Sequence, residues 1–320
     1  MKKRDINLEF IRILSCLFVV LIHVSNHYRR HMGDISYSSY VNSVVINVVT
    51  RLSVPFFFMI SGALLLGREP DRNFKRTLGA MKLLAVWSVV YGLWEILKGT
   101  KLDLLNILYE PVTKHFWYMY VMIGIYIALP YLQILYKNLL ESLKKQFLVI
   151  WFSMLAFSFI SKFLGYTPKY DIPVVATSTY YFGYFVLGHY IYVNKEKFDR
   201  KKSLLIGLLA LFVLFVWTMN AGKTVERVLQ YRNFLMIIAS GTLFHYLLGI
   251  KKVPLKETWI QEISICSLGI YYIHIIFLDI LKWINYLPIH SIIGIPLITA
   301  IVFGLSYLSI KLLHQFGVRT

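Results

Sequence analysis

The chain has 320 residues, of which 58% are hydrophobic and 16% are charged, and its formal net charge is +18. Soluble globular domains carry about 25% charged residues, so a soluble domain of this composition could not cover its apolar surface. The basic residues lie mainly in short loops between apolar segments, which argues against nucleic acid as a partner. The composition therefore predicts an all-α, polytopic membrane protein embedded in the lipid bilayer.

Ten apolar segments are predicted to cross the bilayer, because most of them approach the roughly 20 residues that a spanning helix requires. They are residues 6–26, 41–66, 77–97, 115–135, 147–165, 175–193, 203–220, 232–249, 262–282 and 290–313. The loops between them are too short to hold a soluble module. We therefore expect residues 1–320 to form a single transmembrane domain.

The charges of the loops predict the orientation of the chain. With the spans placed as above, 20 Lys and Arg residues fall on one side of the membrane and 11 on the other. Cytoplasmic loops carry the excess of positive charge, which places both termini in the cytoplasm. The expected location is the cell membrane.

The first span carries an acid, a cation and a base. Arg12 and His23 are 11 positions apart, so on a helix they share one face and lie about 16 Å apart along the axis. Glu9 precedes Arg12 at ion-pair spacing. Two interpretations stay open: a Glu9–Arg12 pair that only fixes helix packing, or a guanidinium that holds an anionic ligand. The second predicts one cavity that contains both Arg12 and His23.

The second span carries Arg51 near the middle of the membrane, four residues before Pro55. Proline cannot donate a backbone hydrogen bond to the residue one turn earlier, so we expect a kink at Arg51. A kink beside a buried cation favours a cavity. The alternative is a packing kink in which Arg51 pairs with one of the few intramembrane acids.

Three further basic residues follow this span: Lys75, Arg76 and, in the next span, Lys82. Basic residues at the cytoplasmic end of a helix commonly bind anionic lipid headgroups. The alternative is that they bind the phosphates of a cofactor such as coenzyme A. Both interpretations fit the sequence equally well.

The fourth and ninth spans carry polar aromatic residues. His115, Trp117 and Tyr118 open the fourth span, where they form either an interfacial aromatic belt or a contact for an acceptor sugar. His274 in the ninth span is expected to be a hydrogen-bonded residue near the site. No cysteine or carboxylate completes a tetrahedral metal site with the histidines that follow His23, so no metal is expected.

Taken together, these motifs resemble the membrane acyltransferase type 3 family, whose bacterial members O-acylate cell-surface polysaccharides. The matching residues are Arg12 and His23 with ten residues between them, Arg51 ahead of Val54-Pro55-Phe56-Phe57-Phe58 and Ser61-Gly62, Trp117-Tyr118 with Tyr126 and Pro130, and Gly269-Ile270-Tyr271-Tyr272-Ile273-His274. Glu9 stands where the family usually has Asp, which retains the charge. The resemblance extends over the whole chain.

The resemblance implies an O-acyltransferase that uses cytoplasmic acetyl-CoA, or another acyl-CoA, and acylates a hydroxyl of an extracytoplasmic cell-surface glycan or lipid-linked acceptor. It implies that Arg12 binds the donor, that His23 is catalytic and that Arg51 assists in the same cavity. On this interpretation Lys75, Arg76 and Lys82 bind the donor phosphates. Residues His115, Trp117, Tyr118 and His274 then lie near the acceptor. The alternative is a transporter or flippase of a lipid-linked glycan, which would use the same buried charges as a translocation path.

Overall fold

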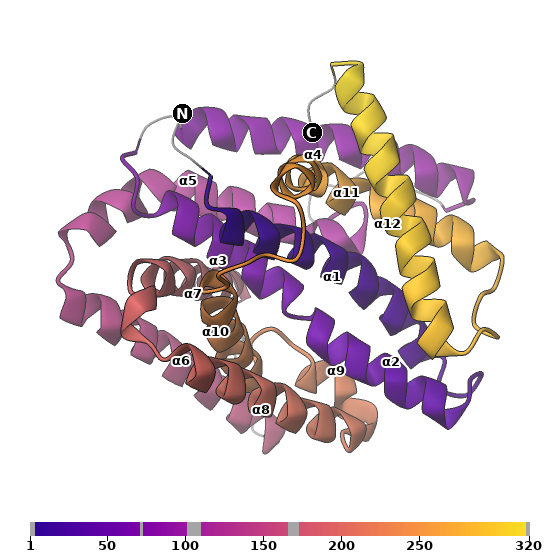
Figure 1. The fold of residues 1–320 in the computed structure, drawn as a ribbon, viewed down its shortest axis with the longest axis horizontal. Coiled ribbons are helices and arrows are strands. Elements are labelled where there is room, and N and C mark those ends of the chain that lie inside the picture. Colours follow the sequence, from indigo (N-terminus) through magenta and orange to yellow (C-terminus); the bar gives the residue numbers. More distant parts are fainter. Residues whose placement is uncertain (1–3, 71–72, 101–109, 166–172, 318–320) are drawn as a thin grey trace.

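The computed structural model describes residues 4–70, 73–100, 110–165 and 173–317. Within these ranges the protein is all-helical (Figure 1). The helices of the N-terminal half are α1 (Ile6–Arg30), α2 (Tyr37–Thr50), α3 (Ser53–Leu65), α4 (Asn73–Leu97), η2 (Lys114–Phe116), α5 (Trp117–Asn138) and α6 (Glu141–Phe163). Those of the C-terminal half are α7 (Pro173–Val193), η3 (Lys195–Lys197), α8 (Arg200–Met219), η4 (Gly222–Thr224), α9 (Val225–Val228), α10 (Phe234–Leu248), α11 (Glu257–Trp283) and α12 (Ser291–Gln315).

Each of the ten predicted spans coincides with helix. Among the described residues, eight helical segments are long and apolar enough to cross a membrane, with α2 and α3 counted as one segment of 29 residues. The remaining two predicted spans are α7, of 21 residues, and α10, which is apolar but has only 15 residues. Many large apolar side chains on α4, α6, α8 and α12 are exposed, as expected for helices that face lipid.

The predicted kink lies where the sequence places it. Helix α2 ends at Thr50, a turn covers Arg51 and Leu52, and α3 begins at Ser53. Because Pro55 has no N–H, the carbonyl of Arg51 receives no helical hydrogen bond from it, and the helix is interrupted there. Arg51 therefore lies between the end of α2 and the start of α3.

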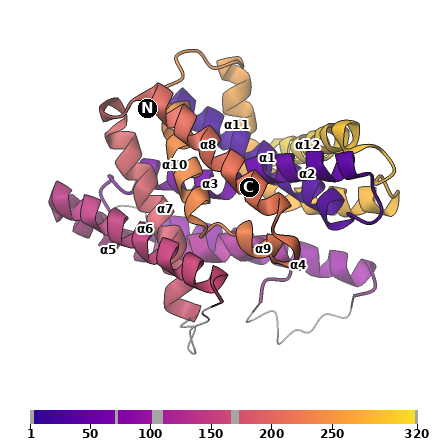
Figure 2. The same cartoon turned by 90° about the horizontal axis from the view of Figure 1, so that it is seen from below.

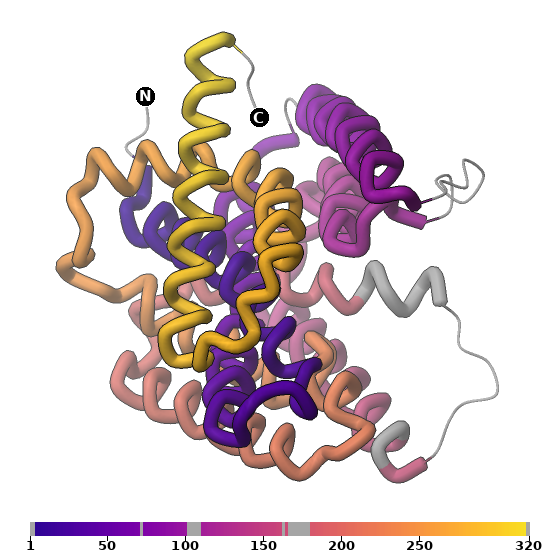
Figure 3. Tube along the Cα trace, turned by 90° about the vertical axis from the view of Figure 1, so that its right-hand side faces the viewer, coloured from indigo at the N-terminus to yellow at the C-terminus, as the bar shows by residue number. Residues whose placement is uncertain are grey.

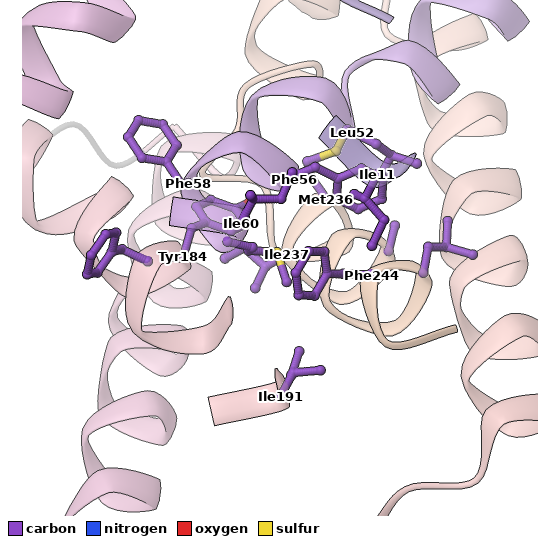
Figure 4. Close-up of a cluster of buried hydrophobic side chains, with 14 of the residues drawn as sticks. Ile11, Leu52, Phe56, Phe58, Ile60, Tyr184, Ile191, Met236, Ile237 and Phe244 are labelled. Atoms are coloured by element: carbon purple, nitrogen blue, oxygen red, sulfur yellow. The ribbon is translucent and has the colours of Figure 1, made fainter. Parts of the chain in front are cut away.

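Helix α1 lies at the centre of the molecule and contributes to all three clusters of buried apolar side chains. Leu8 and Ile11 pack in the first cluster, Cys16 in the second, and Val24 and Tyr28 in the third. The first cluster joins α1 to α3, α7 and α10; Figure 4 shows Ile11, Phe56, Tyr184 and Phe244 among its members. Neighbouring helices thus surround α1, and its polar side chains other than Arg30 are buried or half-buried.

Glycines allow α3 and α7 to pack closely. A Cβ atom on Gly62 would lie 1.8 Å from the carbonyl oxygen of Phe185, and one on Gly188 would lie 2.2 Å from that of Met59. Both contacts involve backbone atoms, which cannot move aside without shifting a helix. Small residues at such crossings let membrane helices approach through their backbones.

N-terminal caps fix where several helices begin. The Asp5 carboxylate accepts hydrogen bonds from the backbone N–H groups of Asn7 and Leu8 at the start of α1. The side chains of Asp199 and Asn233 cap α8 and α10 in the same way. Figure 2 shows the short helix α9 beyond the end of α8, and Figure 3 shows α12, in yellow, extending past the neighbouring helices at one edge of the molecule.

Candidate active site

Two cavities lie along α1. The larger one, which we call the Arg12 cavity, has a volume of about 820 Å³ and is lined by residues of α1, α3, α5, α7 and α11. The smaller one, the His23 cavity, has a volume of about 280 Å³ and is lined by residues of α1, the α2–α3 break, η2, α5, α9 and α11. Arg12 and His23 therefore face internal space toward opposite ends of the same helix.

Two tyrosines stand between the cavities. Tyr118 and Tyr271 belong to the walls of both, and their ring centroids are 5.7 Å apart. The Tyr271 hydroxyl donates a hydrogen bond to the carbonyl of His115, which holds its ring in place. The sequence predicted a single cavity with both Arg12 and His23, whereas the structure contains two that share this aromatic partition.

Arg12 forms the predicted ion pair and keeps donors for a ligand. Its Nη1 lies 3.1 Å from a carboxylate oxygen of Glu9 and 3.4 Å from the hydroxyl of Ser264, which itself donates to Glu9. The Glu9 side chain is 7% exposed and the Arg12 side chain 26%. Only Nη1 of Arg12 is hydrogen-bonded to described residues, so Nε and Nη2 remain for a ligand in the Arg12 cavity. Pairing and ligand binding are thus compatible.

The basic residues at the Arg12 cavity differ from those expected. Arg4 and Arg68, which the sequence placed only in cytoplasmic loops, line the cavity. Lys75 and Lys82 are exposed on α4 and belong to the wall of neither cavity. Arg76 is half-buried and donates a hydrogen bond to Asn73, whose amide bonds Gln133 of α5. The Asn73–Gln133 hydrogen bond connects α4 to α5, and Arg76 holds Asn73 from the α4 side.

His23 lines the smaller cavity. Neither of its ring nitrogens is hydrogen-bonded to a described residue. Two other imidazoles surround it: the ring of His274 has its centroid 5.2 Å from that of His23, and the ring of His115 has its centroid 6.5 Å away. The His115 and His274 centroids are 5.3 Å apart, so three histidines from α1, η2 and α11 form one cluster.

The hydrogen bonds of His274 identify its free nitrogen. Its Nδ1 lies 2.7 Å from the carbonyl of Tyr271 and 3.2 Å from that of Ile270, and a nitrogen between two carbonyls must carry the proton. Its Nε2 is then an acceptor, and that atom is buried without a partner. The Nε2 of His115 is buried and unpartnered as well. Of these two residues, His115 lines the His23 cavity and His274 does not.

Arg51 lines the His23 cavity and has a weak set of protein partners. Its Nε donates a 3.3 Å hydrogen bond to the side-chain oxygen of Asn47, and its guanidinium carbon lies 5.9 Å from the Tyr231 ring centroid. Among the described residues no carboxylate pairs with Arg51, so the alternative of a buried ion pair finds no support there. A desolvated, unpaired guanidinium is suited to a negatively charged ligand or transition state.

Part of the wall of the His23 cavity carries a network of charges. Glu226 of α9 accepts hydrogen bonds from Arg29, at 2.6 Å, and from Arg30, at 3.1 Å, which joins α9 to the end of α1. Burial opposes ionisation of Glu226, but the hydrogen bonds and charges of both arginines outweigh it, so its pKa lies below the usual value. The carboxylate is therefore ionised at neutral pH.

Of the residues predicted to contact an acceptor, His115, Trp117 and Tyr118 line the His23 cavity, and His274 lies directly behind His23. Sequence reasoning missed Arg30, Lys114, Glu226 and Tyr231 as wall residues. They lie in loops or at helix ends, where no periodic pattern marks them. Tyr271 was part of a recognised motif, but its position between the cavities depends on how α5 and α11 pack.

The chain resembles known proteins in sequence. The pattern of an acyltransferase domain, that of the acyltransferase 3 family, matches residues 5–311. The chain is also 29% identical over 133 residues to an amino-acid racemase of Enterococcus faecalis, a match that covers 37% of this chain and 18% of the relative. The chain thus spans less than a fifth of that curated relative's length. No solved structure matches.

Proposed function

The chain belongs to the acyltransferase 3 family, and we propose that it moves an acyl group from a cytoplasmic acyl-CoA to a hydroxyl on the opposite side of the membrane. In this proposal the Arg12 cavity receives the donor and the His23 cavity receives the acceptor. The single observation that carries it is that one helix presents a guanidinium to one cavity and an imidazole to the other, with two tyrosines shared between them.

Arg4, Arg12 and Arg68 would hold the donor. All three line the Arg12 cavity, which is large enough for a ligand of substantial size, since small-molecule sites span about 300–1,000 Å³. Their charges suit the phosphates of coenzyme A better than those of Lys75 and Lys82, which are exposed on α4 and line neither cavity. Arg76, which donates a hydrogen bond to Asn73, would support the contact between α4 and α5.

His23 would act as the general base. It would take the proton of the acceptor hydroxyl while the hydroxyl oxygen attacks the thioester carbonyl, and coenzyme A would leave as its thiolate into the Arg12 cavity. A neutral imidazole can take this proton on the ring nitrogen that carries none. Arg51 would stabilise the oxyanion that forms on the carbonyl oxygen. For this reaction the acyl end must pass between Tyr118 and Tyr271 to reach His23.

The donor is proposed to be acetyl-CoA and the acceptor a cell-surface glycan, in keeping with the family resemblance. The test uses membranes with and without the full chain, incubated with radiolabelled acetyl-CoA. We expect label in the purified envelope glycan together with release of coenzyme A. A transporter or flippase would move a glycan without consuming acetyl-CoA, so the absence of acetyl-CoA-dependent labelling would reject the proposal.

A further inference from the structure

The His23 cavity has an excess of positive charge on its wall. Arg30, Arg51 and Lys114 line it, whereas Glu226 is the carboxylate among its described wall residues. Glu226 is already shared between Arg30 and Arg29, which lies just behind the wall. The site thus carries unbalanced positive charge next to the proposed catalytic base.

Two of these cations have no acidic partner. Neither Arg51 nor Lys114 forms an ion pair with a carboxylate in the part of the chain that the structure describes. Arg51 uses only Nε, toward Asn47, so its two terminal nitrogens are available to the cavity. A charge buried inside a membrane protein is costly unless an opposite charge compensates it. The unpaired guanidinium of Arg51 therefore favours a ligand that carries negative charge.

The surroundings of Arg51 suit a small, flat-faced ligand. Its guanidinium lies near the Tyr231 ring, and the Trp117 ring has its centroid 5.9 Å from that of Tyr231. The planar guanidinium matches the two oxygens of a carboxylate or phosphate. At about 280 Å³ the cavity is at the small end of ligand sites, so it accommodates one unit of an acceptor and not a polymer segment.

We propose that the acceptor unit carries an oxyanion, a carboxylate or a phosphate, close to the hydroxyl that becomes acylated. The oxyanion lies among Arg30, Arg51 and Lys114, and this places the neighbouring hydroxyl at His23. The inference rests on the proposed acyl-transfer function and adds the chemical class of its acceptor. A charge recognised at this wall also raises the rate of acceptor capture at low ionic strength.

The test compares matched acceptors in the purified full chain at low salt. The probes are glucuronate against glucose and glycerol 3-phosphate against glycerol, each measured for ligand-induced thermal stabilisation and for coenzyme A release from acetyl-CoA. We expect at least one anion to stabilise the protein where its neutral counterpart does not, and to react with at least tenfold higher kcat/KM.

Substitutions of Lys114 test whether the preference for anions arises in the His23 cavity. Lys114→Gln should lower the preference for the anion several-fold, and Lys114→Glu should abolish it. Lys114 is exposed and its side chain forms no hydrogen bond or ion pair with a residue that the structure describes, so we expect these changes to leave the fold intact. Lys223→Gln is the matched control, because Lys223 lies in η4, is exposed and is absent from the cavity wall.

The two readouts separate this inference from the proposed function. Equal binding and reaction of anionic and neutral probes would overturn the inference and leave acyl transfer standing. Anion binding that depends on Lys114, without any coenzyme A release, would support an oxyanion site in this cavity, count against acyl transfer and overturn the assignment of the bound anion as an acceptor. An anion preference that survives in Lys114→Glu and in Arg30→Gln would also overturn it, because the selecting charge would then lie elsewhere.

Discussion

The ring of His274 lies 5.2 Å, centroid to centroid, from the ring of His23, with its Nδ1 bound to backbone carbonyls and its Nε2 free of any described partner. A neutral imidazole fixed in this tautomer keeps one acceptor nitrogen, and in His274 that nitrogen is buried beside the cluster without a partner among the described residues. No carboxylate orients His23 within the described residues. His274 is therefore suited to orient His23, as an acidic residue does in many catalytic triads.

We predict that His274→Leu lowers kcat about tenfold, which corresponds to the loss of about 1.4 kcal/mol in the transition state, with little change in the donor KM. His274→Gln should recover part of the activity, because its side-chain oxygen can accept a hydrogen bond near the position of Nε2. Steady-state kinetics of coenzyme A release measure both. Equal losses in Leu and Gln variants would indicate a packing role only.

His23→Ala should lose acyl transfer by roughly 10²–10⁴-fold, the range that a positioned general base contributes. The variant should insert and remain folded, because His23 makes no hydrogen bond to the described protein. His290→Ala serves as the control, since His290 lies in the loop before α12 and outside both cavities. Wild-type turnover in purified His23→Ala would refute the catalytic assignment.

Arg12→Lys should raise the KM for acetyl-CoA about tenfold, because lysine keeps the charge but loses the planar set of donors. The ammonium can still pair with Glu9, so the packing of α1 against α11 is retained. Titration of the donor at saturating acceptor measures the change. If both KM and kcat stay at wild-type values, Arg12 serves only in its ion pair with Glu9 and its hydrogen bond to Ser264.

Gly62→Ala should destabilise the fold by about 1–3 kcal/mol or more, the cost of overpacking, because the new methyl group meets the Phe185 carbonyl. Gly79→Ala is the matched control: Gly79 is also helical, has nothing within 4 Å of its Cβ position, and gains up to about 1 kcal/mol of helix propensity. Thermal unfolding in detergent compares the two. Similar melting temperatures would show that α3 and α7 can separate at little cost.

The Glu226 network should make stability dependent on acid pH. The folded protein holds the pKa of Glu226 below its usual value, so the ionised carboxylate stabilises the fold. This contribution is complete above the unfolded pKa of about 4.3 and is lost as the pH falls through the folded pKa. Glu226→Gln should flatten the pH dependence of the melting temperature in that window. An unchanged profile would show that the ion pair contributes nothing to stability.

The local features of the chain were readable from short stretches of sequence. The ten apolar segments depend only on length and hydropathy, and each coincides with helix. The break at Arg51 follows from the missing N–H of Pro55, and the Glu9–Arg12 pair follows from helical spacing. These predictions succeeded because their causes lie within a few residues of one another.

Which basic residues line the Arg12 cavity could not be predicted from the sequence. Lys75 and Lys82 are seven residues apart and share one face of α4, but the sequence does not say which way that face turns. Arg4 and Arg68 come from the N-terminal segment and the loop after α3, and only the packing of α1 beside α3 brings them to one wall. Their roles as donor-binding residues remain predictions.

By itself the sequence determined an all-helical membrane protein with a cation and an imidazole on one face of its first helix, because helical periodicity and hydropathy are local properties. Only the tertiary structure decided that this face opens into two cavities, that Tyr118 and Tyr271 separate them, and that His115 and His274 surround His23. Those relationships join residues more than 90 positions apart, and their distances depend on how α5 and α11 pack against α1.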